Sequence, residues 1–506
     1  MSKLTLRQGG GLKENVPEGA AVGLKRELGL FSAINLILAV MIGSGIFVSP
    51  ASALKYSGSV GMCLVVWAIC GVISLLGTRI TGLNQPYDGI ATLLGALAFA
   101  ELSTVVPRSG AEYAYFMDSF TPLHPFWGPL PAFLYSWLMV IIIRPAEVAV
   151  IVLTFSEYLC QPVMDALCIA DPQGVQQVKK AVALAGLGII TYINSRSVRL
   201  YVKVQNIFGS FKVLACLVVI ACGVYELSIG NTANLAQGFA GTSASPKNIA
   251  LSFYSGLWAS AVSTVTEEIK QPERNIPKSI MISVPIVTAL YVCMNIAYMS
   301  VLSVPEMVGS QAVAVTFGER ILGPFAFIIP LGVALSTFGC ALSVQLCYVS
   351  GQDGFMLQGF SFVHHKRHTP APAVAFQGLV AFIFIASGDI VRLIEFASFM
   401  IWVSYGTAMV SLLVLRRTRS QVPRPYKVPT WIPIFICLVA VFLSVTPIVT
   451  DPDPMYLFAL GFALLGVPVY YCCCYKKTLQ PKACLNRLTY CLQVLFEAVP
   501  PDAPEP

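Results

Sequence analysis

Charged side chains are scarce in this chain, and their scarcity excludes most classes of soluble protein. Only 11% of the 506 residues are Asp, Glu, Lys or Arg, whereas a typical soluble domain has about 25%. No stretch is both polar enough and long enough to suggest a large soluble domain. The formal net charge of +7 comes from short loops between apolar runs, so it does not indicate a nucleic-acid partner.

Signatures of catalysis and metal binding are also missing. Histidine occurs four times, and His364, His365 and His368 lie in a basic segment that is typical of a solvated loop. The 15 cysteines form no CxxC pair, and most lie in apolar runs, where cysteine is usually a small apolar residue. There is no HExxH or GxSxG motif and no N-x-[ST] acceptor. We therefore expect no enzymatic activity, cofactor, metal or N-glycan.

Apolar residues are correspondingly abundant. They make up 56% of the chain, and the mean hydropathy is +0.74, which predicts an all-α polytopic membrane protein. We expect cytoplasmic tails over 1–29 and 476–506 and a transmembrane domain over 30–475. About twelve spans are predicted, near 30–49, 62–106 (interrupted), 130–154, 178–194, 203–227, 248–265, 279–302, 325–349, 371–387, 392–415, 430–448 and 455–475.

Lysine and arginine are divided unevenly between the two sides of these spans. If the N-terminus is cytoplasmic, 24 of the 32 Lys and Arg residues fall on the cytoplasmic side and six on the other. Cytoplasmic loops of membrane proteins carry the excess of positive charge. The distribution therefore predicts that both termini are cytoplasmic and that the number of spans is even.

The second predicted span is interrupted. Residues 78–95 separate two apolar halves, 62–77 and 96–106, each shorter than the ~20 residues that a straight span needs. If both halves crossed separately, every later loop would change sides and the charge bias would be lost. We interpret 78–95 as an insertion in span two, with a functional re-entrant loop as the alternative.

A glycine-flanked serine interrupts the first predicted span. Gly43, Ser44 and Gly45 lie inside the apolar run 30–48, and two glycines weaken a helix there. Broken backbone at membrane depth is tolerated where it lines a cavity, and its freed amides can bind a carboxylate, as in many secondary transporters. The alternative is close helix packing by small residues.

Two cations fall within predicted spans. Arg144 is followed by Pro145 and then by Glu147 three residues on. An ionisable group inside a membrane is a candidate for function, whereas a mutual Arg144–Glu147 ion pair is the structural alternative. Lys212 is the second such cation.

Nine stretches across almost the whole chain carry a family resemblance. They are KRELGLFSAINLILAVMIGSGIFVSP (25–50), AFAELSTVVPRSGAEYAY (98–115), NSRSVRLYVKVQNIFGSFKVLA (194–215), LSFYSGLW (251–258), TEEIKQPERNIPKSI (266–280), QAVAVTFGERILGP (311–324), HTPAPAV (368–374), RPYKVP (424–429) and LQVLFEAVPP (492–501). These stretches resemble the light chains (catalytic subunits) of the heteromeric amino acid transporters, in the amino acid–polyamine–organocation superfamily. The cystine/dibasic exchanger, the cystine/glutamate exchanger and the aromatic-preferring members are the most similar.

The resemblance implies twelve helices in a five-plus-five inverted repeat, with spans one and six broken at the substrate site. It also implies sodium-independent exchange of neutral/aromatic or cystine/dibasic L-amino acids by alternating access. Amides in span one hold the substrate carboxylate, and carbonyls freed by unwinding in span six hold the ammonium group. The substrate-binding residues implied in this way are Ile42, Gly43, Ser44, Gly45, Ile46, Phe253, Gly256, Leu257, Trp258 and Arg144.

Three of these roles are specific to one residue. Trp258 matches the aromatic that covers the substrate from outside, although an interfacial anchor is the alternative. Arg144 matches a position that differs among the exchangers, and so we expect it to bias side-chain selection. Lys212 matches a common family lysine, and we expect it to brace the site region against the broken span one.

Cys168 lies on the predicted extracellular side between spans three and four. The resemblance implies that it forms an interchain disulfide with a single-span glycoprotein heavy chain, which delivers the pair to the plasma membrane. Cys160, at the end of span three, is the weaker candidate for this bond.

Two spans depart from the family pattern. After Trp258, span six reads ASAVSTVTEE, roughly four residues shorter than in the family, and span eight is about five residues shorter. Loss of about one turn rotates every later side chain of a helix. These changes favour an alternative function, a non-transporting paralogue that acts only as a subunit bound to the heavy chain.

Overall fold

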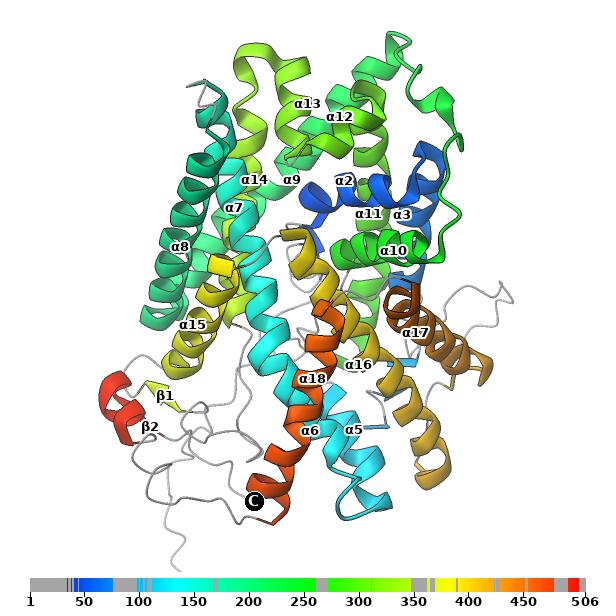
Figure 1. Cartoon of the computed structure of the whole chain (residues 1–506), viewed down its shortest axis with the longest axis vertical. Coiled ribbons are helices and arrows are strands. Elements are labelled where there is room, and N and C mark those ends of the chain that lie inside the picture. The colour runs from blue at the N-terminus through cyan, green and yellow to red at the C-terminus, as the bar shows by residue number, and fades with distance from the viewer. Residues whose placement is uncertain are drawn as a thin grey trace, which may run out of the picture.

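Helices account for nearly all of the described chain in the computed structural model, which is drawn in Figure 1. The structure describes residues 34, 38, 41–43, 45–75, 98–99, 101–102, 105–106, 112–166, 171–260, 272–310, 312–346, 362–364, 369–387, 390–422, 424, 427–450, 454–476 and 490–499. The α-helices in chain order are α2 (Gly45–Ser57), α3 (Val60–Leu75), α5 (Glu112–Phe120), α6 (Leu130–Leu138), α7 (Arg144–Ala166), α8 (Pro172–Arg196), α9 (Val198–Ser228), α10 (Pro246–Ser260), α11 (Pro272–Val301), α12 (Val304–Gly309), α13 (Val313–Leu322), α14 (Ile328–Leu346), α15 (Ala371–Ser387), α16 (Ile390–Thr418), α17 (Trp431–Thr450) and α18 (Pro454–Val469).

The apolar helices confirm an all-α polytopic membrane protein. Within the described ranges, six helical segments are long and apolar enough to cross a membrane, and three shorter helices are also apolar. Each of the predicted spans coincides with at least one described helical segment. Figure 1 places α12 and α13 at one end of the bundle, called here the α13 end, and α5 and α6 at the other, called the α5 end.

The helix pairs follow a five-plus-five repeat. The first span packs against the sixth (α2 with α10), the second against the seventh (α3 with α11), the third against the eighth (α7 with α14) and the fourth against the ninth (α8 with α15). A twofold relation between two halves brings equivalent helices together in this way. These four pairings agree with the repeat that the family resemblance implies.

The third span is a single rod, Leu130–Met164, with one wide turn. Between α6 and α7 lies a π-helical turn, η2 (Met139–Ile143), after which the amide of Arg144 donates to the carbonyl of Met139 five residues back. Pro145 follows, and a proline lacks the amide that an α-helical bond would need. The wide turn accommodates the proline without a break, and such turns are frequent at functional sites.

Backbone hydrogen bonds join the segment before α10 to the turn between α2 and α3. The amide of Ser243 donates to the carbonyl of Ser57, and the amide of Gly61 donates to the carbonyl of Gly238. These contacts fix where α10 begins, and α10 then runs beside α2. The loop thus sets the register of the two helices that carry most of the predicted site.

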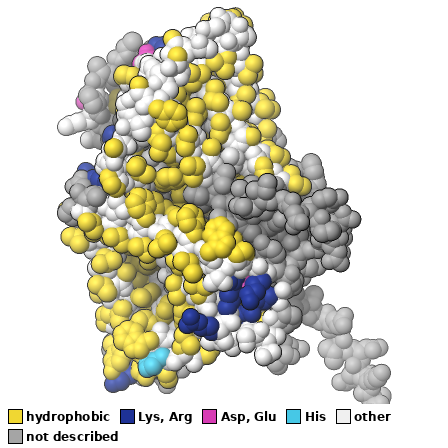
Figure 2. Space-filling model, turned by 90° about the vertical axis from the view of Figure 1, so that its right-hand side faces the viewer, with side chains coloured by type: hydrophobic (Ala, Val, Ile, Leu, Met, Phe, Trp, Pro, Cys, Tyr) yellow, Lys and Arg dark blue, Asp and Glu magenta, His cyan; other side chains and the backbone are white. Residues whose placement is uncertain are grey.

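Large apolar side chains cover much of the outer surface. On α17, Leu438 is 64% exposed and Val449 is 72% exposed, and Figure 2 shows apolar side chains scattered over much of the described surface on one face. Such exposure is costly in water and favourable in lipid. The outward faces therefore agree with a lipid environment.

One small sheet lies beside the helices. Strand β1 (Val363–His364) pairs antiparallel with β2 (Ala498–Val499), so the described end of the C-terminal tail attaches to the segment before α15. The predicted insertion 78–95 and the N-terminal tail 1–29 lie outside the described residues, as do His365 and His368.

Candidate functional site

The first span is broken where the glycines predict. Met41 is helical, and the amide of Ile42 still donates to the carbonyl of Leu38 at 2.9 Å. Ile42 and Gly43 then form a bend, and the helix resumes as α2 at Gly45. Ser44 lies outside the described residues. The break, rather than close packing alone, is therefore what this sequence forms.

The carbonyl of Met41 accepts two hydrogen bonds at the break. The amide of Gly43 donates to it at 2.7 Å, which closes a three-residue turn. The hydroxyl of Tyr291, on α11, donates to the same carbonyl at 2.5 Å. Because an unpaired carbonyl at membrane depth costs free energy, these two donors stabilise the break.

A second buried tyrosine contacts the chain six residues further along, within α2. The hydroxyl of Tyr158, on α7, donates to the carbonyl of Phe47 at 2.7 Å and also contacts the backbone amide of Ala314 on α13. Tyr158 is 1% exposed and Tyr291 is also 1% exposed. Sequence reasoning missed both, although a buried tyrosine hydroxyl in an apolar span needs a partner.

The amides of the break differ in availability. The amide of Gly43 is engaged by Met41, so a carboxylate would have to replace that carbonyl. The first amides of a helix have no partner within the helix, which leaves Gly45 and Ile46 at the start of α2 as donors. The N-terminal end of the helix dipole favours an anion at the same place. Ile42 and Ile46, on either side of the break, are buried.

The predicted residues of span six lie on α10, beside α2, but not in the unwound form that was expected. The helix is continuous from Pro246 through Ser260, so the carbonyls of Phe253 and Gly256 are those of helical residues. Unwinding at these positions is therefore a wrong expectation, because a helical hydrogen-bond ladder already occupies them. Residues 261–271 lie outside the described part of the chain.

Gly256 allows a close approach between α10 and α3. A Cβ atom added at Gly256 would lie 2.7 Å from the sulfur of Cys70. The thiol of Cys70 also contacts the carbonyl of Phe253 at 3.9 Å. Glycine at this position therefore has a packing reason in addition to its predicted role. Leu257 is half-buried, and Trp258 has a described backbone in α10, whereas its side chain lies outside the description.

Arg144 forms the ion pair that its spacing predicts. Its Nη1 lies 2.9 Å from a carboxylate oxygen of Glu147, and both side chains are partly buried. Arg144 lies about 21 Å along α7 from Tyr158, at 1.5 Å per residue. The structure thus places Arg144 nearer the α5 end than the residue that contacts α2. A role in side-chain selection stays a prediction.

Lys212 is fully buried on α9. Cys340, on α14, and Cys216, on α9, are its near neighbours. This position connects α9 with α14. Bracing of the broken first span by Lys212 stays a prediction.

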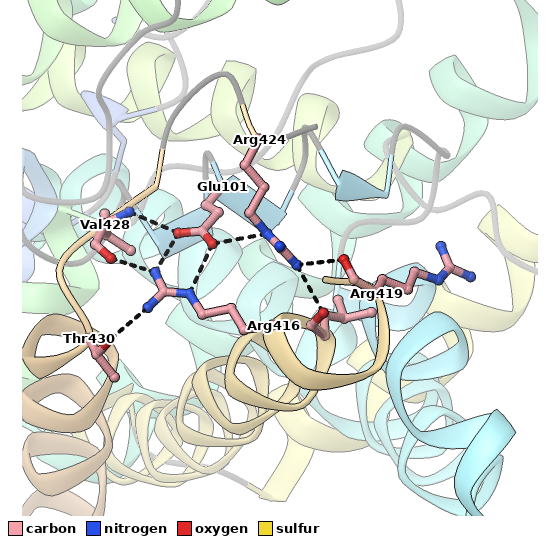
Figure 3. Close-up of polar contacts among 7 residues, drawn as sticks. Glu101, Arg416, Arg419, Arg424, Val428 and Thr430 are labelled. Carbon is pink, nitrogen blue, oxygen red and sulfur yellow. Dashed lines mark hydrogen bonds and ion pairs between the residues drawn. The ribbon is translucent and has the colours of Figure 1, made fainter. Parts of the chain in front are cut away.

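A buried carboxylate organises the α5 end. Glu101 is 0% exposed and accepts two hydrogen bonds from Arg416, from Nε at 2.9 Å and from Nη2 at 2.5 Å (Figure 3). The amide of Val428 donates to Glu101 at 2.9 Å, and Nε of Arg424 forms an ion pair with it at 3.4 Å. Because 315 residues separate Glu101 from Arg416, no local pattern in the sequence could reveal this pair.

Two further predictions concern cysteine and metals. Cys168 lies outside the described residues, and Cys160 is a buried free thiol on α7. Among the residues that the structure describes, no three His, Cys, Asp or Glu side chains gather as metal ligands.

Comparison with known proteins agrees with this architecture. A family model described as "Amino acid permease" matches residues 28–465. The b(0,+)-type amino acid transporter 1 of Homo sapiens is 41% identical over 96% of this chain and 95% of the relative. The cystine/glutamate transporter of Homo sapiens is 35% identical over 98% of each chain, and the large neutral amino acids transporter small subunit 2 of Oryctolagus cuniculus is 36% identical over 92% and 84%. On this similarity, the chain belongs to the amino acid permease family.

Proposed function

We propose that the chain is a sodium-independent exchanger of L-amino acids that works by alternating access, with its substrate site at the break between Met41 and Gly45. The observation that carries the proposal is this break, held open by two donors and placed beside α10. Relatives whose names denote amino acid transporters, matched over almost the full chain, support it.

The substrate carboxylate binds the first amides of α2, those of Gly45 and Ile46, and displaces Met41 from the amide of Gly43. The ammonium group binds carbonyls towards the Ser260 end of α10, at Leu257 and Trp258. These two ends have opposite partial charge, as a zwitterion requires. Trp258 then covers the substrate from the outer side.

Side-chain selection is the proposed role of Arg144. Neutral/aromatic or cystine/dibasic amino acids are the proposed substrates. An Arg144→Gln variant that changes the ranking of substrates while keeping exchange supports selection. If Arg144 serves the ion pair alone, Arg144→Gln lowers thermal stability, the Arg144→Gln/Glu147→Gln double variant restores it, and the ranking stays unchanged.

The chain pairs with a single-span glycoprotein heavy chain through Cys168 at the plasma membrane, with both termini in the cytoplasm. The name of one relative, a small subunit, supports a partner of this kind. A Cys168→Ser variant expressed with a heavy chain loses the covalent complex on non-reducing gels. A covalent complex that survives in this variant overturns the assignment of the bond.

A second candidate function is a non-transporting subunit. The continuous helix at Phe253–Gly256 and the engaged amide of Gly43 favour it, because both remove groups that the substrate would use. Purified chain in proteoliposomes distinguishes the two. An exchanger takes up labelled cystine, arginine, leucine or tyrosine faster when amino acid is preloaded, and equally well in sodium and choline buffers. Absence of uptake by folded protein supports the second candidate, a non-transporting subunit.

A further inference from the structure

Positive charge gathers at the α5 end, where α16 leads into α17. Five basic residues lie between positions 416 and 427, namely Arg416, Arg417, Arg419, Arg424 and Lys427. The transport cycle proposed above uses none of them. Their side chains divide into an inward set, which is Arg416, Arg419 and Arg424, and an outward set, which is Arg417 and Lys427.

Three of the five pair with acids of the protein. Arg416 and Arg424 contact the buried carboxylate of Glu101, and their side chains are only 9% and 8% exposed (Figure 3). Arg419 pairs with Asp118 on α5 at 2.7 Å. The two carboxylates neutralise two of the five positive charges, so the cluster retains a net charge of +3.

Arg417 and Lys427 form the outward set. Both are exposed, and neither makes a hydrogen bond or ion pair within the described part of the chain. Figure 2 shows Lys and Arg side chains gathered below an apolar surface on this side of the molecule. Two of the three uncompensated positive charges, those of Arg417 and Lys427, therefore face outward.

The inward set fixes the backbone that carries the outward set. Arg416 donates to the carbonyl of Val428 at 2.6 Å and to the hydroxyl of Thr430 at 3.2 Å. Arg417 adjoins Arg416, and Lys427 adjoins Val428. The two outward cations thus project from segments that are held together before any ligand binds, which lowers the entropy cost of binding.

Apolar surface begins directly beside these cations. Trp431, the first residue of α17, is 52% exposed, and Phe435 and Leu438 on the same helix are 47% and 64% exposed. Only 28% of the span Trp431–Val449 is buried within the protein. Tryptophan is enriched where a span meets the lipid headgroups, so Arg417 and Lys427 lie at the level of those headgroups.

We propose that Arg417 and Lys427 bind the headgroup of an anionic phospholipid, whose acyl chains lie along the exposed face of α17. The net positive charge selects an anionic headgroup over a zwitterionic one, and the adjoining apolar face selects a lipid over a soluble anion. In the orientation proposed above this is the cytoplasmic leaflet, where anionic lipids are concentrated. The site does not depend on which amino acid the chain transports.

Native mass spectrometry of the purified full chain tests this site by comparing retention of phosphatidylserine with that of phosphatidylcholine. The Arg417→Gln/Lys427→Gln variant removes the outward cations, and Lys55→Gln/Arg392→Gln removes two exposed cations elsewhere as a matched control. Each surface cation contributes roughly a fivefold preference. We expect the first variant to lose about twenty-five-fold of the preference for phosphatidylserine and the control to keep it.

Several results would overturn the proposal. They are retention of phosphatidylserine that is unchanged in Arg417→Gln/Lys427→Gln, an equal loss in the control, or displacement by millimolar inorganic phosphate. If the variant does not fold, the wild-type protein is measured at 0.1 M and 1 M salt, where the screening length falls from about 10 Å to 3 Å. Retention must then fall with salt, and constant retention contradicts the site.

Discussion

The hydroxyl of Tyr291 on α11 donates a hydrogen bond to the carbonyl of Met41, the last helical residue before the break in the first span. The contact joins the seventh span to the first, 250 residues away in sequence. The break is therefore stabilised by tertiary structure, because α11 supplies a hydrogen-bond donor that the interrupted helix no longer provides to the Met41 carbonyl. Tyr291 also packs edge-on against Trp67 on α3, which fixes the ring.

Removing this hydroxyl tests its contribution. Tyr291→Phe removes one of the two described donors to the Met41 carbonyl, so we expect a loss of about 1 kcal/mol of stability. Tyr298→Phe is the matched control, since the hydroxyl of Tyr298 is buried and has no hydrogen-bond partner among the residues that the structure describes. Thermal unfolding in detergent measures both. Equal stability of the two variants would contradict the role of Tyr291.

Glu101 is a buried carboxylate that pairs with both Arg416 and Arg424 at the α5 end. Glu101→Gln leaves two nearly buried guanidinium groups, those of Arg416 and Arg424, with a neutral partner, and breaking a buried ion pair costs about 3–5 kcal/mol. Glu306→Gln removes the carboxylate from an exposed pair with Arg320 and serves as the control, because exposed pairs contribute little. We expect a large drop in unfolding temperature for Glu101→Gln alone. A comparable drop in both variants would show that burial does not set the effect.

The Glu306–Arg320 pair, which joins α12 to α13 outside the spans, predicts a dependence on pH. Hydrogen bonds from Arg320 and then from Ser303 lower the pKa of Glu306 from 4.5 to about 2. Since the pKa is lower in the folded protein, the ionised carboxylate stabilises the fold above pH 4.5, and this contribution is lost as the pH falls towards 2. The stability difference between wild type and Glu306→Gln should therefore be constant near neutral pH and shrink below pH 4.5. A difference that stays constant through this window refutes the assignment.

The contact between Gly256 and Cys70 predicts a rescue. Gly256→Ala places a methyl group 2.7 Å from the Cys70 sulfur, and overpacking of this kind costs about 1–3 kcal/mol. Cys70→Ala removes that sulfur, so the Gly256→Ala/Cys70→Ala double variant should recover stability. Gly188→Ala is the control, because open space surrounds Gly188. Failure of the second substitution to rescue the first would place the cost elsewhere on α10.

Local patterns in the sequence predict some of these features well. Gly43 and Gly45 weaken a helix by themselves, so the break in the first span is predictable from three adjacent residues. Arg144 and Glu147 lie three residues apart on one helix face, and their ion pair follows from helical geometry. The span positions follow from hydropathy for the same reason, since each depends on one continuous segment.

Contacts between distant segments are not predictable in this way. Nothing near Met41 indicates that Tyr291 supplies its donor, and nothing near Glu101 indicates Arg416. The expected unwinding at Phe253 and Gly256 came from family resemblance, whereas the hydrogen bonds of α10 continue through both. Helical geometry is the default for a backbone in lipid, and one glycine in this helix is not enough to break it.

The central claim is that the break in the first span carries an exchange site. The most direct measurement is uptake of labelled amino acid into proteoliposomes, with and without preloaded amino acid, for wild type, Gly43→Val and Gly188→Ala. Our account predicts uptake that rises with internal amino acid for wild type and for Gly188→Ala, and a loss of tenfold or more for Gly43→Val, whose side chain fills the bend where the carboxylate binds. Unchanged exchange by Gly43→Val, or no exchange by folded wild-type protein, would contradict it.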